Sequence, residues 1–102
     1  MTFDDRNAIR SFATVVKSET DDTEMQAEAQ NAGDTAEFAI MCPAGAERAE
    51  QLDDARGLLD SVAARFEKLK PGLTGSASIR IPKAIRAFEE AINRMLAECA
   101  SA

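Results

Sequence analysis

The 102-residue chain contains no His, Trp or Tyr, and only three Pro, five Gly, five Phe and two Cys. Without His it lacks the side chain that most often serves as a general base or metal ligand near neutral pH. The five Phe are the only aromatic side chains left for stacking on bases, and a core of this size needs them. Composition therefore argues against direct nucleic-acid binding and against His-dependent catalysis.

Long apolar runs are also missing. The longest strictly apolar run, residues 38–42, is far shorter than the roughly 20 residues of a bilayer helix, and the first residues are acidic where a secretory segment is basic. We therefore expect no membrane association and a cytoplasmic location. Cys42 and Cys99 stand far apart and outside any Cys-x-x-Cys pair, so we interpret them as reduced thiols packed as small apolar groups, with a disulfide as the alternative.

Catalytic motifs are absent as well. The sequence has no phosphate-binding glycine loop, no nucleophile elbow and no calcium-binding loop. Adjacent carboxylates such as Asp21-Asp22 and Glu89-Glu90 point about 100° apart on a helix, so they do not converge on one substrate atom. We expect no catalytic residue, no metal site and no cofactor, and interpret the chain as non-enzymatic.

The residues that are abundant favour helix. Ala, Glu, Asp, Arg and Leu dominate the sequence, which predicts an all-α fold. We expect residues 1–102 to form a single domain, a small antiparallel bundle of about four helices. The predicted helices cover residues 3–17, 21–42, 43–70 and 82–100.

Two apolar seams support an antiparallel pair of helices. Both repeat at alternating spacings of three and four residues, which is the pattern of helices packed at a shallow angle. The seam of the third helix is Leu52, Ala55, Leu59, Val62, Phe66 and Leu69, and that of the last helix is Ile85, Phe88, Ile92, Met95 and Cys99. A short echo also links residues 8–12 and 84–88, which match at four of five positions.

Three details complete the predicted fold. Thr2 is the expected N-cap of the first helix, with Asp5 as its capping-box partner. The sequence Asn-Ala-Gly-Asp around Gly33 predicts a break in the second helix. Residues 71–81 are expected to form a long loop whose apolar side chains, Leu73, Ile79 and Ile81, pack against the end of the bundle.

Charge is distributed unevenly along the chain. The net charge is −6, yet thirty consecutive residues, 18–47, contain no Lys or Arg. Residues 19–54 carry eleven acidic side chains against Arg48 alone, whereas residues 65–86 carry six basic side chains against Glu67 alone. The chain is therefore an electrostatic dipole along its sequence.

Three interpretations of the acidic segment stay open. It is a solvated helix face, or it pairs with the basic ends of the third and fourth helices, or it is a binding surface for a basic partner. Under the third interpretation the candidate partner-binding residues are Glu19, Asp21, Asp22, Glu24, Glu28, Asp34 and Glu37.

The expected function follows the third interpretation. Clustered carboxylates on a rigid helix can occupy a basic groove that normally holds phosphates. We therefore expect a small acidic stoichiometric inhibitor or adaptor that docks on a basic protein or nucleic-acid-binding complex. In size, acidity and lack of catalytic motifs the chain is similar, by analogy only, to phage-encoded anti-defence proteins such as anti-CRISPR proteins. The alternative is a self-associating structural or scaffold bundle, such as a homodimer, whose acidic and basic segments pair between protomers.

Overall fold

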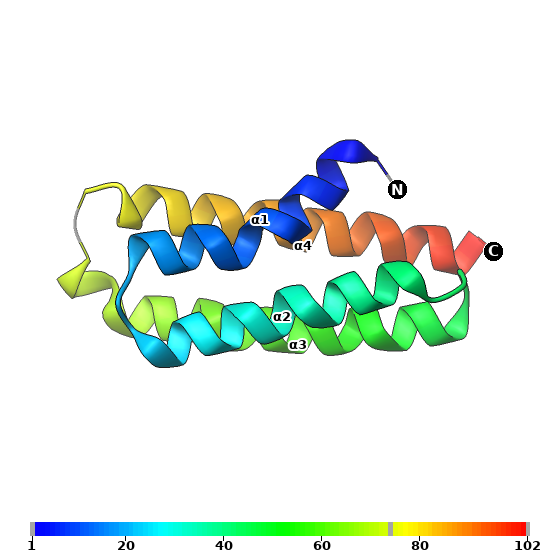
Figure 1. Ribbon diagram of the computed structural model, residues 1–102, viewed down its shortest axis with the longest axis horizontal. Coiled ribbons are helices and arrows are strands. Elements are labelled where there is room, and N and C mark those ends of the chain that lie inside the picture. The colour runs from blue at the N-terminus through cyan, green and yellow to red at the C-terminus, as the bar shows by residue number, and fades with distance from the viewer. Residues whose placement is uncertain (1, 74, 102) are drawn as a thin grey trace.

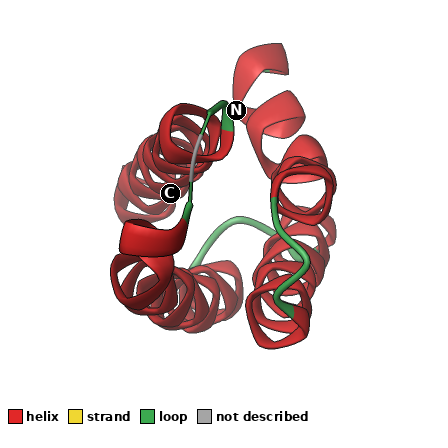
Figure 2. Cartoon of the chain, turned by 90° about the vertical axis from the view of Figure 1, so that its left-hand side faces the viewer, coloured by secondary structure: helices red, strands yellow, loops and turns green. Residues whose placement is uncertain are grey.

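The computed structural model describes residues 2–73 and 75–101, and this part of the chain is helical with no strand. It contains α1 (Phe3–Glu19), α2 (Thr23–Met41), α3 (Ala46–Leu69), the short 3₁₀ helix η1 (Lys70–Gly72) and α4 (Ala77–Ser101). Successive helices run antiparallel along the 44 Å length of the molecule (Figure 1). The four α-helices form a ring in which α1 lies beside both α2 and α4, and α3 beside both α2 and α4 (Figure 2). The predicted all-α antiparallel bundle is confirmed.

The predicted seams form the core. All of their residues are buried except Leu69 and Ile85, which are half-buried at the edge of the core. From α1, the core receives Ile9, Phe12 and Val16. The ring centroids of Phe12 and Phe88 lie 4.7 Å apart, so the two echoing segments of the sequence meet across the α1–α4 interface. The echo thus marks two similar turns that face the same core.

The prediction of a break near Gly33 was wrong, because α2 is continuous from Thr23 to Met41. Gly33 is buried, and a Cβ atom there would lie 3.8 Å from the backbone carbonyl oxygen of Ile9. A narrow stripe of small residues (Ala29, Ala32, Gly33 and Ala36) lets this helix pack closely on its neighbours. Burial along the whole stripe outweighs the roughly 1 kcal/mol that a glycine costs inside a helix.

The third helix begins at Ala46, three residues later than the predicted start at Pro43. Gly45 precedes it with a φ of 135°, a conformation that side chains with a Cβ rarely adopt. Arg48, in the first turn of α3, reaches back to the end of α2. Its Nε donates to the carbonyl oxygens of Ala39 and Cys42, both at 3.0 Å, and its Nη2 donates to those of Ile40 at 2.9 Å and Cys42 at 2.6 Å. The single cation of the acidic segment therefore caps a helix C-terminus.

The prediction of a loop over residues 71–81 was wrong in its second half. α4 begins at Ala77, which leaves Pro82 inside the helix rather than at its start. Ala77 and Ile81, four residues apart, are both buried and draw this segment into the helix. Leu73 and Ile81 pack against the bundle as predicted, whereas Ile79 is exposed. Thr74 lies outside the described residues.

Several smaller predictions are settled by the same structure. Thr2 caps α1, with its Oγ1 accepting a hydrogen bond from the Asp5 amide at 3.1 Å. Cys42 and Cys99 are free and buried, as expected of thiols packed as small apolar groups. Over residues 2–73 and 75–101, no helix is long and apolar enough to cross a membrane.

Candidate partner-binding surface

The seven candidate residues lie on α1, the turn that follows it, and α2. Glu19 ends α1, Asp21 and Asp22 lie in the turn, and the remaining four follow along α2. They do not form one uniform face, because some are paired within the molecule and others are exposed without a basic partner.

Glu19 is turned inward by contacts with the start of α4. Its side chain is only 8% exposed, and its Oε1 accepts a hydrogen bond from Nη1 of Arg80 at 2.5 Å. Its Oε2 accepts a second hydrogen bond from the Ser76 hydroxyl at 2.6 Å. These contacts join the α1–α2 turn to the residues that lead into α4. Glu19 is therefore a structural carboxylate rather than a free docking group.

Asp22 is also used within the fold. Its Oδ2 accepts a hydrogen bond from the Met25 amide at 2.8 Å and so caps the N-terminus of α2. Arg65 of α3 donates to both oxygens of the same carboxylate, from Nε at 3.0 Å and from Nη2 at 2.8 Å. The Arg65 guanidinium, followed by the Met25 amide, lowers the pKa of Asp22, and the hydrogen bonds between Arg65 and Asp22 raise the pKa of Arg65.

Arg65 reaches two further acidic residues of α2. Its Nη1 lies 3.3 Å from Oε2 of Glu24, whose side chain is 59% exposed. Glu28 lies one turn further along, half-buried, and attracts Arg65 electrostatically. Its Oε2 is covered and has no hydrogen-bond donor among the described residues. At this end of α2, the interpretation that the acidic segment pairs with basic residues of the same chain therefore holds.

The last two turns of α2 are different. Asp34, Glu37, Phe38 and Met41 follow the spacing i, i+3, i+4, i+7, which places them on one face. All four are exposed, on the side of the helix opposite its buried stripe, and we call them the α2 outer stripe. Phe38 is 48% and Met41 75% exposed, so the stripe presents apolar surface to solvent next to its carboxylates. Within the described residues, neither acidic residue of the stripe has a basic side chain within 4 Å, and Asp34 accepts a hydrogen bond only from Gln30.

The first turns of α3 lie beside the last turns of α2, because the two helices are antiparallel neighbours joined by a short turn (Figure 1). They carry further exposed carboxylates: Glu47, Glu50, Asp53 and Asp54. Among these, Asp53 is paired with Arg56 at 2.6 Å. Arg48 is turned toward the α2 carbonyl groups and away from these acids. The choice of candidate residues omitted this contribution from α3, although the charge count over residues 19–54 had pointed to it.

Fold and surface together define the class of the protein, an antiparallel four-helix bundle that exposes carboxylates and two large apolar side chains at the end where α2 passes into α3. Within residues 2–73 and 75–101, no three His, Cys, Asp or Glu side chains gather in a way that could hold a metal ion. No protein-family model, curated protein or solved structure matches the chain.

Proposed function

We propose that the protein is a non-enzymatic interaction module, a small stoichiometric inhibitor or adaptor that docks an acidic helical face on a basic groove of a nucleic-acid-binding protein. The observation that carries this proposal is the α2 outer stripe. It combines unpaired carboxylates with exposed apolar side chains on one rigid helix face. A cytoplasmic site of action is part of the same proposal.

Within this proposal, the carboxylates that take part are those whose charge no cation of the same chain compensates. Glu19 and Asp22 are held by cations of the same chain, and Glu24 shares Arg65 with Asp22, so their charge is largely compensated. Asp34 and Glu37 are not compensated in this way. We therefore place the centre of the docking face on the second half of α2 and on the exposed carboxylates of the first turns of α3.

Physical chemistry favours a partner protein whose groove normally binds phosphates. Such a groove is rich in Lys and Arg and responds to the spacing and number of negative charges, so carboxylates on a helix can replace the nucleic-acid backbone. Phe38 and Met41 add contacts that phosphates lack. Apolar side chains at the centre of an interface with charges around them are the usual arrangement of a tight protein contact.

Charge reversal tests the proposal. The tagged wild-type chain is used to recover binding partners from a lysate of the cells in which the protein occurs. The recovered partner is then purified and titrated with each variant at several salt concentrations. We expect the double variant Asp34→Lys/Glu37→Lys to bind at least about tenfold more weakly, and wild-type binding to weaken as salt rises. Nucleic acid should compete for the same protein.

A matched control separates the effect of charge at the proposed face from the effect of net charge on binding. The double variant Asp60→Lys/Glu89→Lys changes two exposed acidic residues of α3 and α4 and alters the net charge by the same amount. It should bind within about twofold of wild type. Equal binding by both double variants, or binding that does not respond to salt, would overturn the proposed face.

A further inference from the structure

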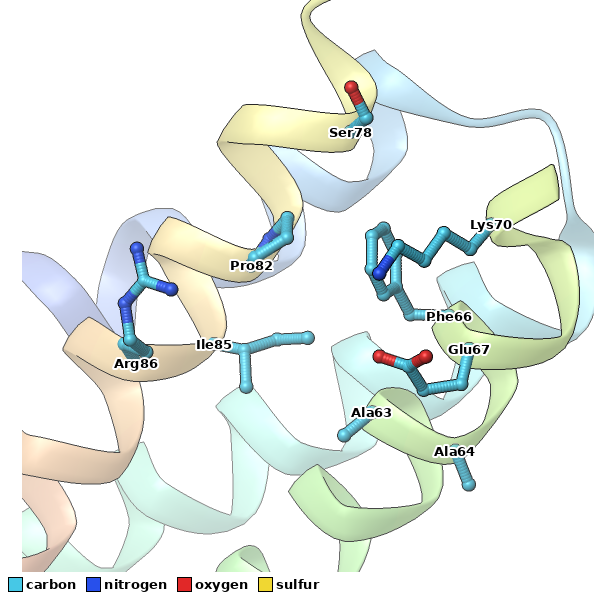
Figure 3. Close-up of a pocket in the computed structure, with 9 residues that line it drawn as sticks. All are labelled: Ala63, Ala64, Phe66, Glu67, Lys70, Ser78, Pro82, Ile85 and Arg86. Atoms are coloured by element: carbon cyan, nitrogen blue, oxygen red, sulfur yellow. The ribbon is translucent and has the colours of Figure 1, made fainter. Parts of the chain in front are cut away.

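A second surface feature lies at the other end of the bundle, between the last turns of α3 and the first turns of α4. It is a cavity of about 410 Å³, within the size range of ligand pockets. Figure 3 shows Phe66 of α3 and Ile85 of α4 directed toward the space between the two helices. Ala63 and Pro82 add to its apolar lining. The cavity is thus open to an apolar group from outside.

The rim of this cavity is mainly positive. Lys70 and Arg86 line it, opposed by Glu67 alone. Neither of these two cations has a carboxylate within 4 Å among the residues that the structure describes. The group that fits such a site is an apolar side chain with carboxylates on either side, because it satisfies both the lining and the rim.

The α2 outer stripe of this same chain has that chemistry. Phe38 supplies an exposed ring, Asp34 supplies a carboxylate one turn earlier, and Glu37 supplies another at the neighbouring position. We propose that the stripe of one copy docks on the α3–α4 cavity of a second copy, with Phe38 in the cavity and the two carboxylates beside Lys70 and Arg86. This self-association goes beyond the proposed function and does not depend on it.

The geometry makes this contact heterologous. The stripe belongs to the end of the bundle where α2 passes into α3, and the cavity belongs to the end where α3 passes toward α4 (Figure 1). In Figure 2 the α3–α4 edge and α2 lie on different sides of the ring. Two different surfaces therefore meet, and each pair of copies keeps one free stripe and one free cavity. Association should continue beyond the dimer as concentration rises.

Two variants each disrupt one half of the proposed interface. Phe38→Glu removes the apolar group of the stripe and leaves the cavity intact, whereas the double variant Lys70→Glu/Arg86→Glu reverses the rim and leaves the stripe intact. All three changed side chains are exposed, so the fold should tolerate both variants, and circular dichroism checks this. Phe3→Glu is the matched control, because it replaces another exposed Phe by Glu and so adds the same charge outside the proposed interface.

Sedimentation equilibrium of the purified chain then measures mass against concentration. A contact formed around one cavity is small, so we expect wild type and Phe3→Glu to associate at about 100 µM and less so at high salt. Each interface variant alone should stay monomeric. An equimolar mixture of the two should form 1:1 pairs that do not grow, because one copy supplies the stripe and the other the cavity.

Three results would overturn the proposal. Wild type could stay monomeric up to about 1 mM, in which case the cavity and the stripe do not meet. The variants could associate as strongly as wild type, which would place the contact elsewhere. The mixture could remain monomeric although wild type associates. None of these results bears on capture of a foreign basic protein, which is measured separately with that protein present.

Discussion

Arg94 of α4 holds the carboxylate of Asp5 in the first turn of α1. Its Nε and Nη2 both donate to Oδ1, at 2.8 Å and 2.5 Å, across 89 positions of sequence. Asp5 is only 1% exposed, and a buried carboxylate is tolerated because it has such a partner. The Arg94 guanidinium lowers the pKa of Asp5 against the opposing effect of burial. This pair ties the first helix to the last.

Replacing that carboxylate should weaken the fold in a pH-dependent way. We expect Asp5→Asn to lower the free energy of unfolding by about 1–2 kcal/mol at pH 7, because the hydrogen bonds from Arg94 lose their charge assistance. The carboxyl pKa is lower in the folded state than in the unfolded chain, so its contribution is complete above about pH 4 and is lost as the pH falls through the folded value. Urea unfolding followed by circular dichroism from pH 3 to pH 7 measures the difference.

The neighbouring exposed residue provides the control for that experiment. Asp4→Asn removes the same charge from the same helical turn but breaks no buried pair, and it should change stability by less than about 0.5 kcal/mol. If the two variants behaved alike, or if the deficit of Asp5→Asn stayed constant down to pH 3, the Arg94 pair would not be the cause.

Arg48 should matter for stability far more than a surface arginine. Arg48→Gln removes hydrogen bonds to the last carbonyl groups of α2, and we expect it to lower the free energy of unfolding by about 1–2 kcal/mol. Arg56→Gln makes the same change two turns later on α3, where the side chain pairs with exposed Asp53, and should cost less than about 0.5 kcal/mol. Equal losses in urea titrations of the two variants would contradict the capping role.

Gly33 offers a stabilising substitution. A methyl group there meets only an ordinary van der Waals contact at 3.8 Å from the Ile9 carbonyl oxygen, so Gly33→Ala should raise the free energy of unfolding by about 0.5–1 kcal/mol. Gly57→Ala, in an open position inside α3, gives the gain from helix propensity alone. Thermal melts of both variants measure the two gains in stability. A gain for Gly33→Ala well below that for Gly57→Ala would mean that the added methyl group is crowded against α1.

Pro82 is the other local defect of the bundle. Lacking an amide hydrogen, it cannot donate to the carbonyl of residue 78 inside α4. We expect Pro82→Ala to raise the free energy of unfolding by about 1–2 kcal/mol, since it restores that hydrogen bond and removes the clash of the ring with the preceding turn. A lower melting temperature would instead show that the ring's packing at the α3–α4 cavity outweighs the lost hydrogen bond.

The sequence predicted the helices where apolar spacing was regular and failed where local signals opposed burial. The seams of α3 and α4 identified core residues directly, because a repeat of three and four fits only a helix with one buried side. Gly33 and Pro82 are residues that end helices in isolation. Both sit inside helices here because buried residues on either side, such as Ala32 and Ile81, hold the backbone in place.

The candidate surface was predicted in part. The charge count located the acidic segment, but it could not show which carboxylates are free. Arg65 lies 43 positions from Asp22 and Arg80 lies 61 from Glu19, so only the fold brings these pairs together. Phe38 lies off the buried stripe of α2, and its alignment with Asp34 and Glu37 follows only once that helix is known to be unbroken.

The two free thiols have a practical consequence. Cys42 closes α2 and Cys99 lies in the last turn of α4, and both are covered. Because Cys42 is 7% and Cys99 9% exposed, we expect alkylation to follow opening of the surrounding structure, so labelling rates in the native protein report the opening equilibrium at each position. The chain has no Trp or Tyr to serve as a fluorescent probe, so the two thiols are its built-in probes of local opening. Mass spectrometry can measure the label at each Cys in the wild-type protein, so no substitution is needed.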